Sequence, residues 1–453
     1  MDKCKKTTKN VVKDTVSSFT VDEDNLHTKK NGYQNNTTSS SSSSSSSSGR
    51  TSKIIENVLI LQGGGSLGAF GCGVFKALSQ KNVKIDIVAG TSIGGVNAAI
   101  IAGSKNEKHP EQFLEEFWLE LADSFVDLNN FAITSSFPFF EQMLSNYYSS
   151  SFSTSDQKKN ESIRKIEEYR IESLRSFLSS AIFGNAKMFK ARWLLEYALT
   201  DPDYFQPAKW TYLYDHSPLA TTLKKYIDYD KLKPTGKPNS RLIITAVNVL
   251  TSEPLTFDSY RQPITPKHLL ATSGYPAYNL PWVEIEKGVY AWDGGLLSNT
   301  PLREVINASP VNDKRIFLVE NYPKKINALP QNLLEVYHRT RDIIFCDKTL
   351  NTVTMAKVIT RYLRYIDELY KMIDDCVDLT KVEKEQLEKI RRKYKRYKQD
   401  TGAEIKNVYY ISRDEHVHSI YENADFSPKV IKDSIREGEL KTNQILDEIG
   451  KNK

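Results

Sequence analysis

The sequence predicts an α/β fold with a mainly parallel central sheet. Two short apolar segments, residues 58–61 and 83–89, are predicted as buried strands, and each continues through a glycine-containing turn into a helical segment. Repetition of strand, turn and helix is typical of parallel sheets, because the chain must return along the sheet between one parallel strand and the next. The apolar runs are short and bounded by turn residues, which favours strands over helices.

The apolar pattern returns after a long insertion and completes the predicted sheet. Residues 241–247 are predicted to form a strand, with 255–257 as its hairpin partner. Residues 289–292 and 315–319 are predicted as two further strands, of which the second is the last central one. The main domain is therefore predicted to cover residues 54–320.

The insertion between these strands, about residues 104–240, is predicted to be mainly helical and is rich in aromatic residues. Seven aromatic side chains crowd one short stretch of it: Phe131, Phe137, Phe139, Phe140, Tyr147, Tyr148 and Phe152. Two interpretations stay open for this stretch. It forms a lid or an acyl-chain pocket, or it provides ordinary packing between helices.

Residues 321–453 are predicted to form a helical C-terminal region packed on the main domain. Long helices are expected over 331–400, a late strand at 407–411 and a final helix at about 428–448. Residues 391–398 hold six basic side chains in eight positions. Such a run either contacts anionic lipid or is a solvated helix face.

Residues 1–53 are predicted to be a disordered, serine-rich tail. They end in an unbroken run of serine at 39–48, and a segment of this composition buries too little apolar surface to offset the entropy lost on ordering. The tail carries nine Lys and Arg against five Asp and Glu, which is four of the net six positive charges of the chain. The remainder is close to balance, which argues against a nucleic-acid partner.

A cytoplasmic location is expected, with peripheral contact to a membrane or lipid surface as an addition suggested by the basic run. No apolar run approaches the roughly 18 residues that would span a bilayer, and the N-terminal lysines are not followed by an apolar segment. The four cysteines, Cys4, Cys72, Cys346 and Cys376, form no C-x-x-C pair, so neither a zinc site nor a disulfide framework is predicted. The oligomeric state is not predicted.

Ser92 is the candidate nucleophile. It lies at the centre of a G-x-S-x-G pentapeptide between Gly90 and Gly94, after a predicted strand and before a predicted helix of small residues. A tight turn at this point exposes the serine hydroxyl, and the N-terminus of the following helix adds a positive potential. The pentapeptide alone is weak support for catalysis, because Gly and Ser are common.

A glycine loop after the first predicted strand is the candidate oxyanion site. Residues 63–68 read Gly-Gly-Gly-Ser-Leu-Gly, and glycines without Cβ atoms allow successive N–H groups to converge on one point. The same loop matches the dinucleotide fingerprint G-x-G-x-x-G, and Asp86 follows Gly68 by 18 residues, where a ribose-binding acid is sought. However, Asp86 is predicted to lie inside the second strand, whereas the fingerprint needs it at the strand's C-terminal end.

Asp293 is the candidate base. It closes a predicted strand and is followed by Gly294 and Gly295, so its carboxylate would project from a tight turn. An aspartate before glycine is by itself a common turn residue. An ordinary aspartate, with a pKa near ~3.9, is also a poor acceptor for a serine proton.

Taken together, the three motifs resemble the patatin-like phospholipase family. The family pattern is G-G-G-x-x-G, then G-x-S-x-G, then D-G-A/G, and the chain supplies all three in this order at Gly63, Ser92 and Asp293. The resemblance covers about residues 54–320. Further segments at 214–219, 296–302 and 425–427 resemble the bacterial and archaeal branch that carries an extra C-terminal region.

The resemblance implies a patatin-like three-layer fold and a lipid acyl hydrolase with no cofactor and no metal. It implies a Ser92–Asp293 dyad that acts through a covalent acyl-enzyme on a lipid or phospholipid substrate, and thus a role in lipid degradation. The implied oxyanion donors are the N–H groups of Gly64, Gly65 and Ser66. Many members carry Arg where this chain has Leu67.

Three alternatives stay open. His338, His416 and His418 follow Asp293 in the chain order of a Ser-Asp-His esterase, although none has a motif around it. The absence of Arg at position 67 fits a catalytically weak lipid-binding protein. The glycine loop keeps a dinucleotide-binding oxidoreductase as a third alternative, although that interpretation leaves Ser92 and Asp293 unexplained.

Overall fold

The computed structural model describes residues 54–126, 169, 172–376, 383–400, 403–415 and 422–451. The chain divides into two compact units, Met1–Ser52 and Lys53–Lys453, and all described residues belong to the second. The predicted tail, the aromatic stretch at 131–152, and His416 and His418 lie outside the described residues. Within the described part of the chain, no helix is both long and apolar enough to cross a bilayer.

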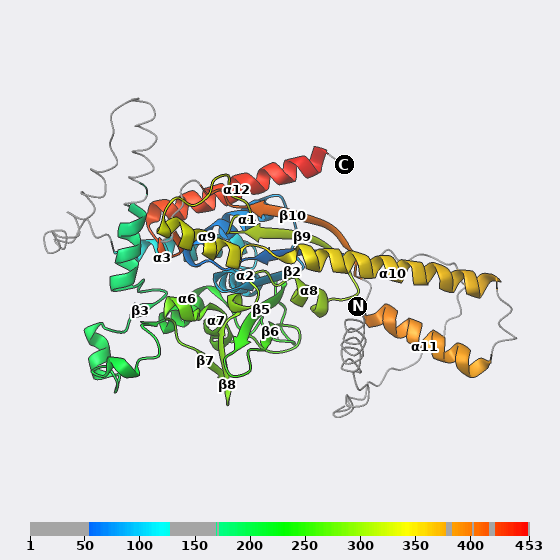
Figure 1. The fold of residues 1–453 in the computed structure, drawn as a ribbon, viewed down its shortest axis with the longest axis horizontal. Helices are drawn as coiled ribbons and strands as arrows, with labels where there is room; N and C mark the ends of the chain where they lie inside the picture. The colour runs from blue at the N-terminus through cyan, green and yellow to red at the C-terminus, as the bar shows by residue number, and fades with distance from the viewer. Residues whose placement is uncertain are drawn as a thin grey trace, which may run out of the picture. The chain divides into compact units, whose positions relative to one another are not determined.

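One mixed sheet organises the second unit (Figure 1). Its strand order is β10-β9-β1-β2-β5-β8-β7, with β6 paired to β5. Every pairing from β10 to β5 is parallel, whereas β5–β6, β5–β8 and β7–β8 are antiparallel. The strands are β1 (Ile55–Leu61), β2 (Ile87–Thr91), β5 (Arg241–Asn248), β6 (Pro254–Asp258), β7 (Val283–Glu286), β8 (Val289–Asp293), β9 (Asp313–Glu320) and β10 (Ile405–Ser412). A separate ladder joins β3 (Lys190–Ala191) to β4 (Tyr214–Asp215).

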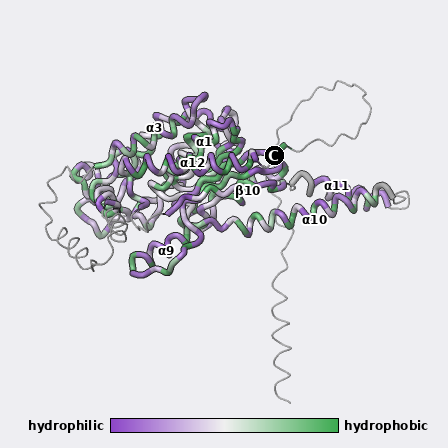
Figure 2. Tube along the Cα trace, turned by 90° about the horizontal axis from the view of Figure 1, so that it is seen from above, coloured by the Kyte–Doolittle hydropathy of each residue, from purple (hydrophilic) through white to green (hydrophobic). Residues whose placement is uncertain are grey.

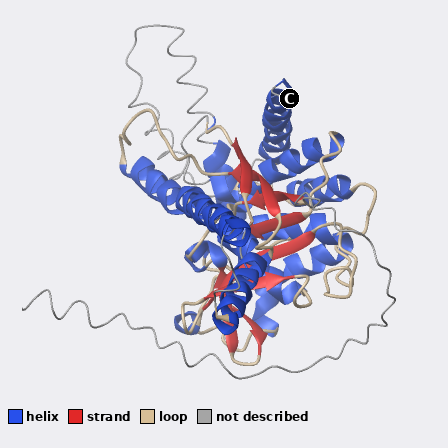
Figure 3. Ribbon diagram, turned by 90° about the vertical axis from the view of Figure 1, so that its right-hand side faces the viewer, coloured by secondary structure: helices blue, strands red, loops and turns tan. Residues whose placement is uncertain are grey.

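Alternate side chains of the central strands face two helical layers, which gives three layers in all (Figure 3). Leu59 and Leu61 pack into the larger cluster, whereas Val58 and Ile60 pack into the smaller one on the opposite face, as the period of two in a strand requires. The predicted α/β fold with a mainly parallel sheet is confirmed. The larger cluster includes side chains of α1 (Gly68–Gln80), α2 (Ile93–Gly103), α3 (Pro110–Asp123), α6 (Ser217–Tyr226), α7 (Pro266–Ser273) and α12 (Pro428–Lys451), and the smaller includes side chains of α8 (Leu302–Ala308) and α10 (Thr349–Cys376).

Two glycines bring the last helix into direct contact with the first. A Cβ atom on Gly73 in α1 would overlap the carbonyl oxygen of Ile435, and one on Gly438 in α12 would overlap that of Phe70. The backbones of α1 and α12 therefore touch. The C-terminal helix is thus part of the main core, as is β10, which extends the sheet beside β9.

The structure adjusts several predicted elements. The second strand begins at Ile87 and extends to Thr91, so Asp86 lies before its N-terminal end and not inside it. There its carboxylate accepts the backbone N–H of Asn57 at 2.9 Å, at the opposite end of the strand from the serine turn. Asp86 is therefore still further from the position that a dinucleotide site requires.

Within the predicted insertion, the described residues combine helices with irregular segments. They form α3, a helix over 172–183 and α6, whereas 184–216 consist of turns, short 3₁₀ helices and the β3–β4 ladder. Two further helices, α9 (Leu333–Phe345) and α11 (Lys384–Asp400), lie in the C-terminal third of the chain. The proposed division into domains at residues 54, 320 and 453 stays a prediction.

Candidate active site

Ser92 lies on the turn between β2 and α2 with a backbone of φ 57° and ψ −132°. This conformation is strained for a residue with a side chain, and such strain is characteristic of a nucleophile held on a tight turn. The flanking glycines make the turn possible. A Cβ on Gly90 would overlap the carbonyl of Gly94, and one on Gly94 would overlap the carbonyl of Leu61.

The sheet register brings Asp293 to Ser92. Thr91, the last residue of β2, pairs with Thr245 of β5, and Asp293, the last residue of β8, pairs with Ala246. Because β6 occupies the other edge of β5 at these positions, β2 and β8 share one edge and meet end to end. The antiparallel direction of β8 thus places its final carboxylate beside the residue that follows β2.

The carboxylate of Asp293 is buried and accepts two hydrogen bonds. The Ser92 side chain supplies one, and the backbone N–H of Gly295 donates the other to Oδ1 at 2.7 Å. Burial raises the pKa of Asp293 to about 7, although both hydrogen bonds act to lower it. This value removes the difficulty of the dyad, because a carboxylate with a pKa near 7 has a far greater affinity for a serine proton than an ordinary aspartate.

Threonine side chains under the turn fix the backbone of Ser92. Its N–H donates to Thr272 Oγ1 at 3.1 Å, and that hydroxyl donates in turn to the carbonyl of Thr245 at 2.6 Å. The hydroxyls of Thr91 and Thr245 are 2.9 Å apart. Ser92 is therefore connected through short hydrogen bonds to β5 and α7, which makes its strained position rigid. The sequence gave no motif that would identify Thr272.

The glycine loop packs directly against the nucleophile. A Cβ built on Gly63 would lie 2.7 Å from the Cβ of Ser92, and the N–H of Gly63 donates to Asn299 Oδ1 at 2.9 Å. Gly64 and Gly65 have φ angles of 149° and 59°, which only glycine adopts readily. Across the described ranges, the N–H groups of these two glycines donate to no protein acceptor, and both residues line the same cavity as Ser92.

Ser66, the third predicted oxyanion residue, has a different environment. Its side chain is buried and its hydroxyl donates to the carbonyl of Glu422 at 2.5 Å, so it anchors the loop to the C-terminal part of the chain. Ser66 does not line the cavity. Leu67, where the family resemblance suggests Arg in many members, is also buried and packs against Tyr322 and Phe345.

A short C-terminal segment braces the glycine loop from behind. Asn423 donates through Nδ2 to the carbonyl of Gly64 at 2.8 Å and to the Tyr322 hydroxyl at 2.7 Å. Arg341 of α9 donates to Asn423 Oδ1, so a buried guanidinium supports the loop indirectly. Sequence reasoning did not find Asn423, because it lies more than 350 residues from the loop and outside every motif.

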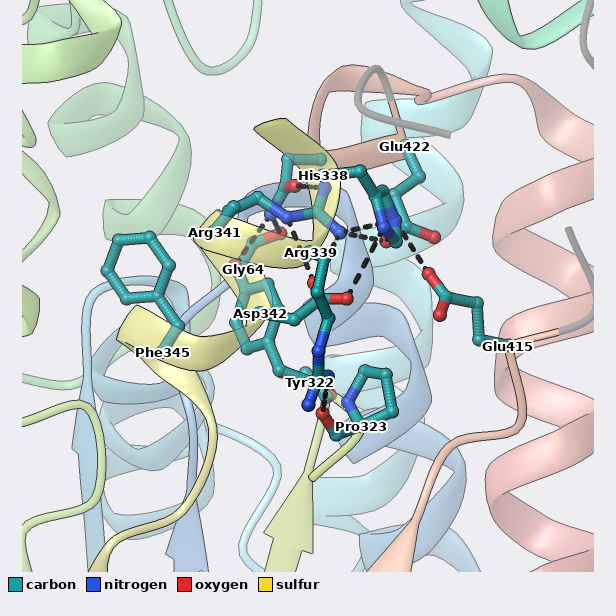
Figure 4. A network of polar contacts seen from close by, with 12 residues as sticks. Gly64, Tyr322, Pro323, His338, Arg339, Arg341, Asp342, Phe345, Glu415 and Glu422 are labelled. Atoms are coloured by element: carbon teal, nitrogen blue, oxygen red, sulfur yellow. Dashed lines mark hydrogen bonds and ion pairs between the residues drawn. The ribbon is translucent and has the colours of Figure 1, made fainter. Parts of the chain in front are cut away.

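Arg341 belongs to a buried network of ion pairs (Figure 4). Its Nη2 lies 2.8 Å from Asp342 Oδ1 and 2.6 Å from Glu422 Oε1, while Arg413 lies 3.0 Å from Glu422 Oε2. His338 Nε2 lies 2.6 Å from Glu415. The His338, Asp342, Glu415 and Glu422 side chains are close enough for a metal site, but the Arg341 guanidinium already supplies a cation in contact with two of the carboxylates.

His338 contacts carboxylates of this network and does not line the cavity that contains Asp293. Burial lowers the pKa of His338, but hydrogen bonds to Glu415 and Glu422 outweigh burial and raise it to about 9. The pKa of Glu422 is lowered to about 2 by Arg413, His338 and Arg341 despite its burial. Within the described chain, no histidine lines the cavity that holds Ser92.

The cavity above Ser92 and Asp293 has a volume of about 270 Å³ and a mainly apolar lining. Residues of the insertion line one part of it, and residues of α9 and the C-terminal segment line another. Such a cavity suits a hydrocarbon chain that leads to a polar reacting group. The principal apolar residues are Phe177, Met188, Phe189, Tyr275, Phe345 and Phe426.

Comparisons with known proteins show what the chain is similar to. Residues 59–306 match the family model of the patatin-like phospholipases. A segment of 132 residues is 31% identical to an uncharacterized protein, L620, of Acanthamoeba polyphaga mimivirus and covers 28% of this chain and 32% of that protein. A segment of 63 residues is 40% identical to the triacylglycerol lipase SDP1L of Arabidopsis thaliana and covers 14% of this chain and 8% of that protein. The chain thus matches a third or less of the length of these two relatives.

Solved structures with some likeness to the chain were also found. VipD from Legionella pneumophila has 15% sequence identity and a TM-score of 0.35, over 88% of this chain and 67% of VipD. A structure of ExoU in complex with SpcU from Pseudomonas aeruginosa gives 18% identity and a TM-score of 0.24, over 63% of this chain and 47% of the matched one.

Proposed function

The chain belongs to the patatin-like phospholipase family, and from this premise we propose that it is a lipid acyl hydrolase whose nucleophile is Ser92 and whose base is Asp293. The observation that carries the proposal is the raised pKa of Asp293, about 7, in contact with the hydroxyl of a strained serine. A buried carboxylate of this kind can accept the serine proton near neutral pH without the help of a histidine.

In the first half of the proposed reaction, the Ser92 oxygen attacks the ester carbonyl carbon while its proton passes to Asp293. The carbonyl π electrons move to the oxygen, which becomes an oxyanion that the N–H groups of Gly64 and Gly65 stabilise. Each such donor is typically worth roughly 3–4 kcal/mol in the transition state. Collapse of the tetrahedral intermediate breaks the ester C–O bond, and the leaving alcohol takes the proton from Asp293.

In the second half, a water molecule attacks the acyl carbon of the Ser92 ester. Asp293 accepts a proton from this water, and the same two glycine N–H groups hold the second oxyanion. When the C–O bond to Ser92 breaks, the serine oxygen recovers the proton from Asp293 and a carboxylic acid leaves. The cycle needs neither a metal nor a cofactor.

We propose lipid esters as the substrate class, because the cavity lining is apolar and a short segment of the chain resembles a triacylglycerol lipase. Ser66 is proposed to anchor the oxyanion loop through its hydroxyl, so Gly64 and Gly65 are the principal donors. Peripheral contact with a lipid surface and membership of the branch with an additional C-terminal region remain parts of this proposal.

Hydrolysis of a panel of phospholipids, triacylglycerols and short-chain esters tests the function, with Ser92→Ala as the control. The wild-type protein is expected to release fatty acid from at least one lipid class, and Ser92→Ala from none. A fluorophosphonate probe gives a second measurement, because it labels only an activated serine. A protein that binds lipid but neither hydrolyses esters nor takes the label would be the catalytically weak lipid-binding alternative.

A further inference from the structure

The helix α9 buries three polar or charged side chains and exposes most of its apolar ones. His338, Arg341 and Asp342 are buried against the fold. The opposite side of the helix forms what we call the α9 apolar face, whose members have exposed fractions from 45% to 64%: Leu333, Val336, Tyr337, Ile343 and Ile344. A surface helix of a globular protein normally has the reverse arrangement, so this face requires an explanation. Figure 2 shows α9 at the outside of the fold.

Buried ion pairs fix α9 in this orientation. Arg341 contacts Asp342, Glu422 and Asn423, and the residues that it contacts lie within the fold. Rotation of the helix to bury the apolar face would separate Arg341 from Glu422 and Asn423 and leave Glu422 without this partner, which is strongly unfavourable in a buried position. The apolar face therefore points outward as a consequence of the same network that braces the glycine loop.

The α9 apolar face lies beside the catalytic cavity. Phe345, at the C-terminal end of α9, lines that cavity, and the neighbouring Ile344 shares a second depression with Leu296 and Leu297. These two leucines follow the Asp293-Gly-Gly motif almost directly and are 41% and 53% exposed. Ile344 and the two leucines thus border one depression next to the catalytic cavity, and polar residues make up much of the rest of its lining.

The charges around this surface are mainly basic. Within residues 323–350, four basic side chains and one acidic side chain, Glu335, are not buried: the basic ones are Lys324, Lys325, Arg339 and Lys348. Lys324 is ion-paired with Glu320 and Asp347, so three basic residues remain against one acidic residue. Arg339 donates to the carbonyls of residues 323 and 324, and Lys348 donates to the carbonyl of Ile344, so these residues lie beside α9. An exposed apolar face bordered by basic residues is the arrangement of helices that lie in the interface of an anionic membrane. Charge complementarity therefore favours an anionic lipid surface as the occupant.

We propose that the α9 apolar face, together with Leu296 and Leu297, docks the protein on an anionic lipid surface and so sets the cavity rim against the layer that contains the substrate. The choice of a lipid surface rests on the proposed lipid-ester hydrolase function. The proposal separates binding to the surface, which α9 performs, from ester cleavage, which Ser92 and Asp293 perform.

Vesicle co-sedimentation of the full chain tests the docking surface. Ser92→Ala is the background, so that the lipid stays intact. The vesicles are phosphatidylcholine alone or with phosphatidylglycerol. The double substitution Val336→Ser with Ile343→Ser is expected to weaken binding by at least about tenfold, because two apolar side chains no longer enter the interface. The control, Leu250→Ser with Leu440→Ser, changes two apolar side chains elsewhere that are more exposed than Val336 and Ile343, and it is expected to alter binding less than about twofold.

A second pair of measurements separates this proposal from the proposed function. For these measurements the α9 double variant is made in the protein that keeps Ser92. It should retain hydrolysis of a dissolved short-chain ester and lose hydrolysis of an ester of the same acyl group in vesicles. Lys325→Gln should weaken binding roughly fivefold on anionic vesicles and leave phosphatidylcholine vesicles unaffected.

Equal binding of the α9 variant and the wild type would overturn the docking proposal, as would absence of binding by the wild type. Loss of a concentration-dependent dimer in the α9 variant, without any vesicle binding, would assign the face to a second copy of the chain instead. If vesicle binding depends on α9 but no ester is hydrolysed, the docking surface stands and the proposed function fails.

Discussion

Replacing Asp293 by asparagine should abolish turnover and at the same time stabilise the folded protein above neutral pH. Asparagine has the same shape and can still accept the N–H of Gly295, but it cannot take the serine proton and carries no buried charge. The two effects have one cause, the burial that raises the pKa of Asp293 from 3.8 to about 7. A buried aspartate with a purely structural role would give the change in stability without the loss of turnover.

The direction of the stability effect follows from proton linkage. An acid whose pKa is higher in the folded state binds more protons when folded, so the stability of the wild type falls as the pH rises from about 4 to about 7. With these two pKa values, the raised pKa of Asp293 lowers the free energy of unfolding by about 2 kcal/mol at pH 5 and by about 4 kcal/mol at pH 8. The asparagine variant avoids this cost. Its advantage over the wild type should therefore grow by about 2 kcal/mol between the two pH values.

Urea denaturation of both proteins at pH 5 and pH 8 measures this difference. The pH profile of kcat/KM for the wild type provides the kinetic counterpart, because the free enzyme must hold Asp293 ionised. Activity should fall about tenfold for each pH unit below 7, whereas an aspartate with an ordinary pKa would give a flat profile from pH 5 to 8. A flat profile, or a stability difference that does not change with pH, would refute the argument from burial.

Three further predictions concern the supports of the site. Asn423→Ala removes the hydrogen bond to the carbonyl of Gly64 and should lower kcat by 10–100-fold with little change in KM. An unchanged kcat would mean that the glycine loop keeps its geometry without Asn423. His338→Gln should retain turnover within about tenfold. Its loss of stability should be largest below pH 6.5 and vanish above about pH 9, because the pKa of His338 is raised in the folded protein. Abolished turnover in a folded variant would favour the Ser-Asp-His triad. Gly438→Ala should reduce the stability by about 2–4 kcal/mol in denaturation, because its Cβ meets the Phe70 carbonyl, and an unchanged stability would contradict the close contact of α1 and α12.

The strands could be predicted, and the proposed catalytic pair could be suggested, because their signals are local. Short apolar runs bounded by glycine identify β1 and β5, and the turn chemistry around Ser92 and Asp293 is contained in five and three residues. The boundary of β2 was misplaced by four residues, because the apolar residues Val83 and Ile85 are part of the approach to the strand and not of its ladder. Packing against β1 and not hydrophobicity decides where that ladder begins.

The supports of the site could not be predicted, because they depend on contacts between distant segments. Thr272 and Asn299 hold Ser92 and Gly63, but a lone threonine or asparagine carries no signal of its partner. The raised pKa of Asp293 is likewise a property of burial, which no tripeptide motif contains. Sequence reasoning therefore named the two residues of the proposed dyad, but not the burial of Asp293 that supports the proposal.

The part of the chain beyond the family match supplies a strand beside β1 and contacts to the glycine loop. The match ends at residue 306, before β9, which lies between β1 and β10, and before α9 and Asn423. Arg341 and Asn423 together connect α9, the C-terminal segment and the carbonyl of Gly64, so a change in the position of α9 is expected to affect the glycine loop. Since the other side of α9 is the proposed docking face, the same helix joins the lipid surface to the glycine loop. Docking and catalysis should accordingly respond together to substitution of Arg341, and separately to substitution of the outward apolar residues.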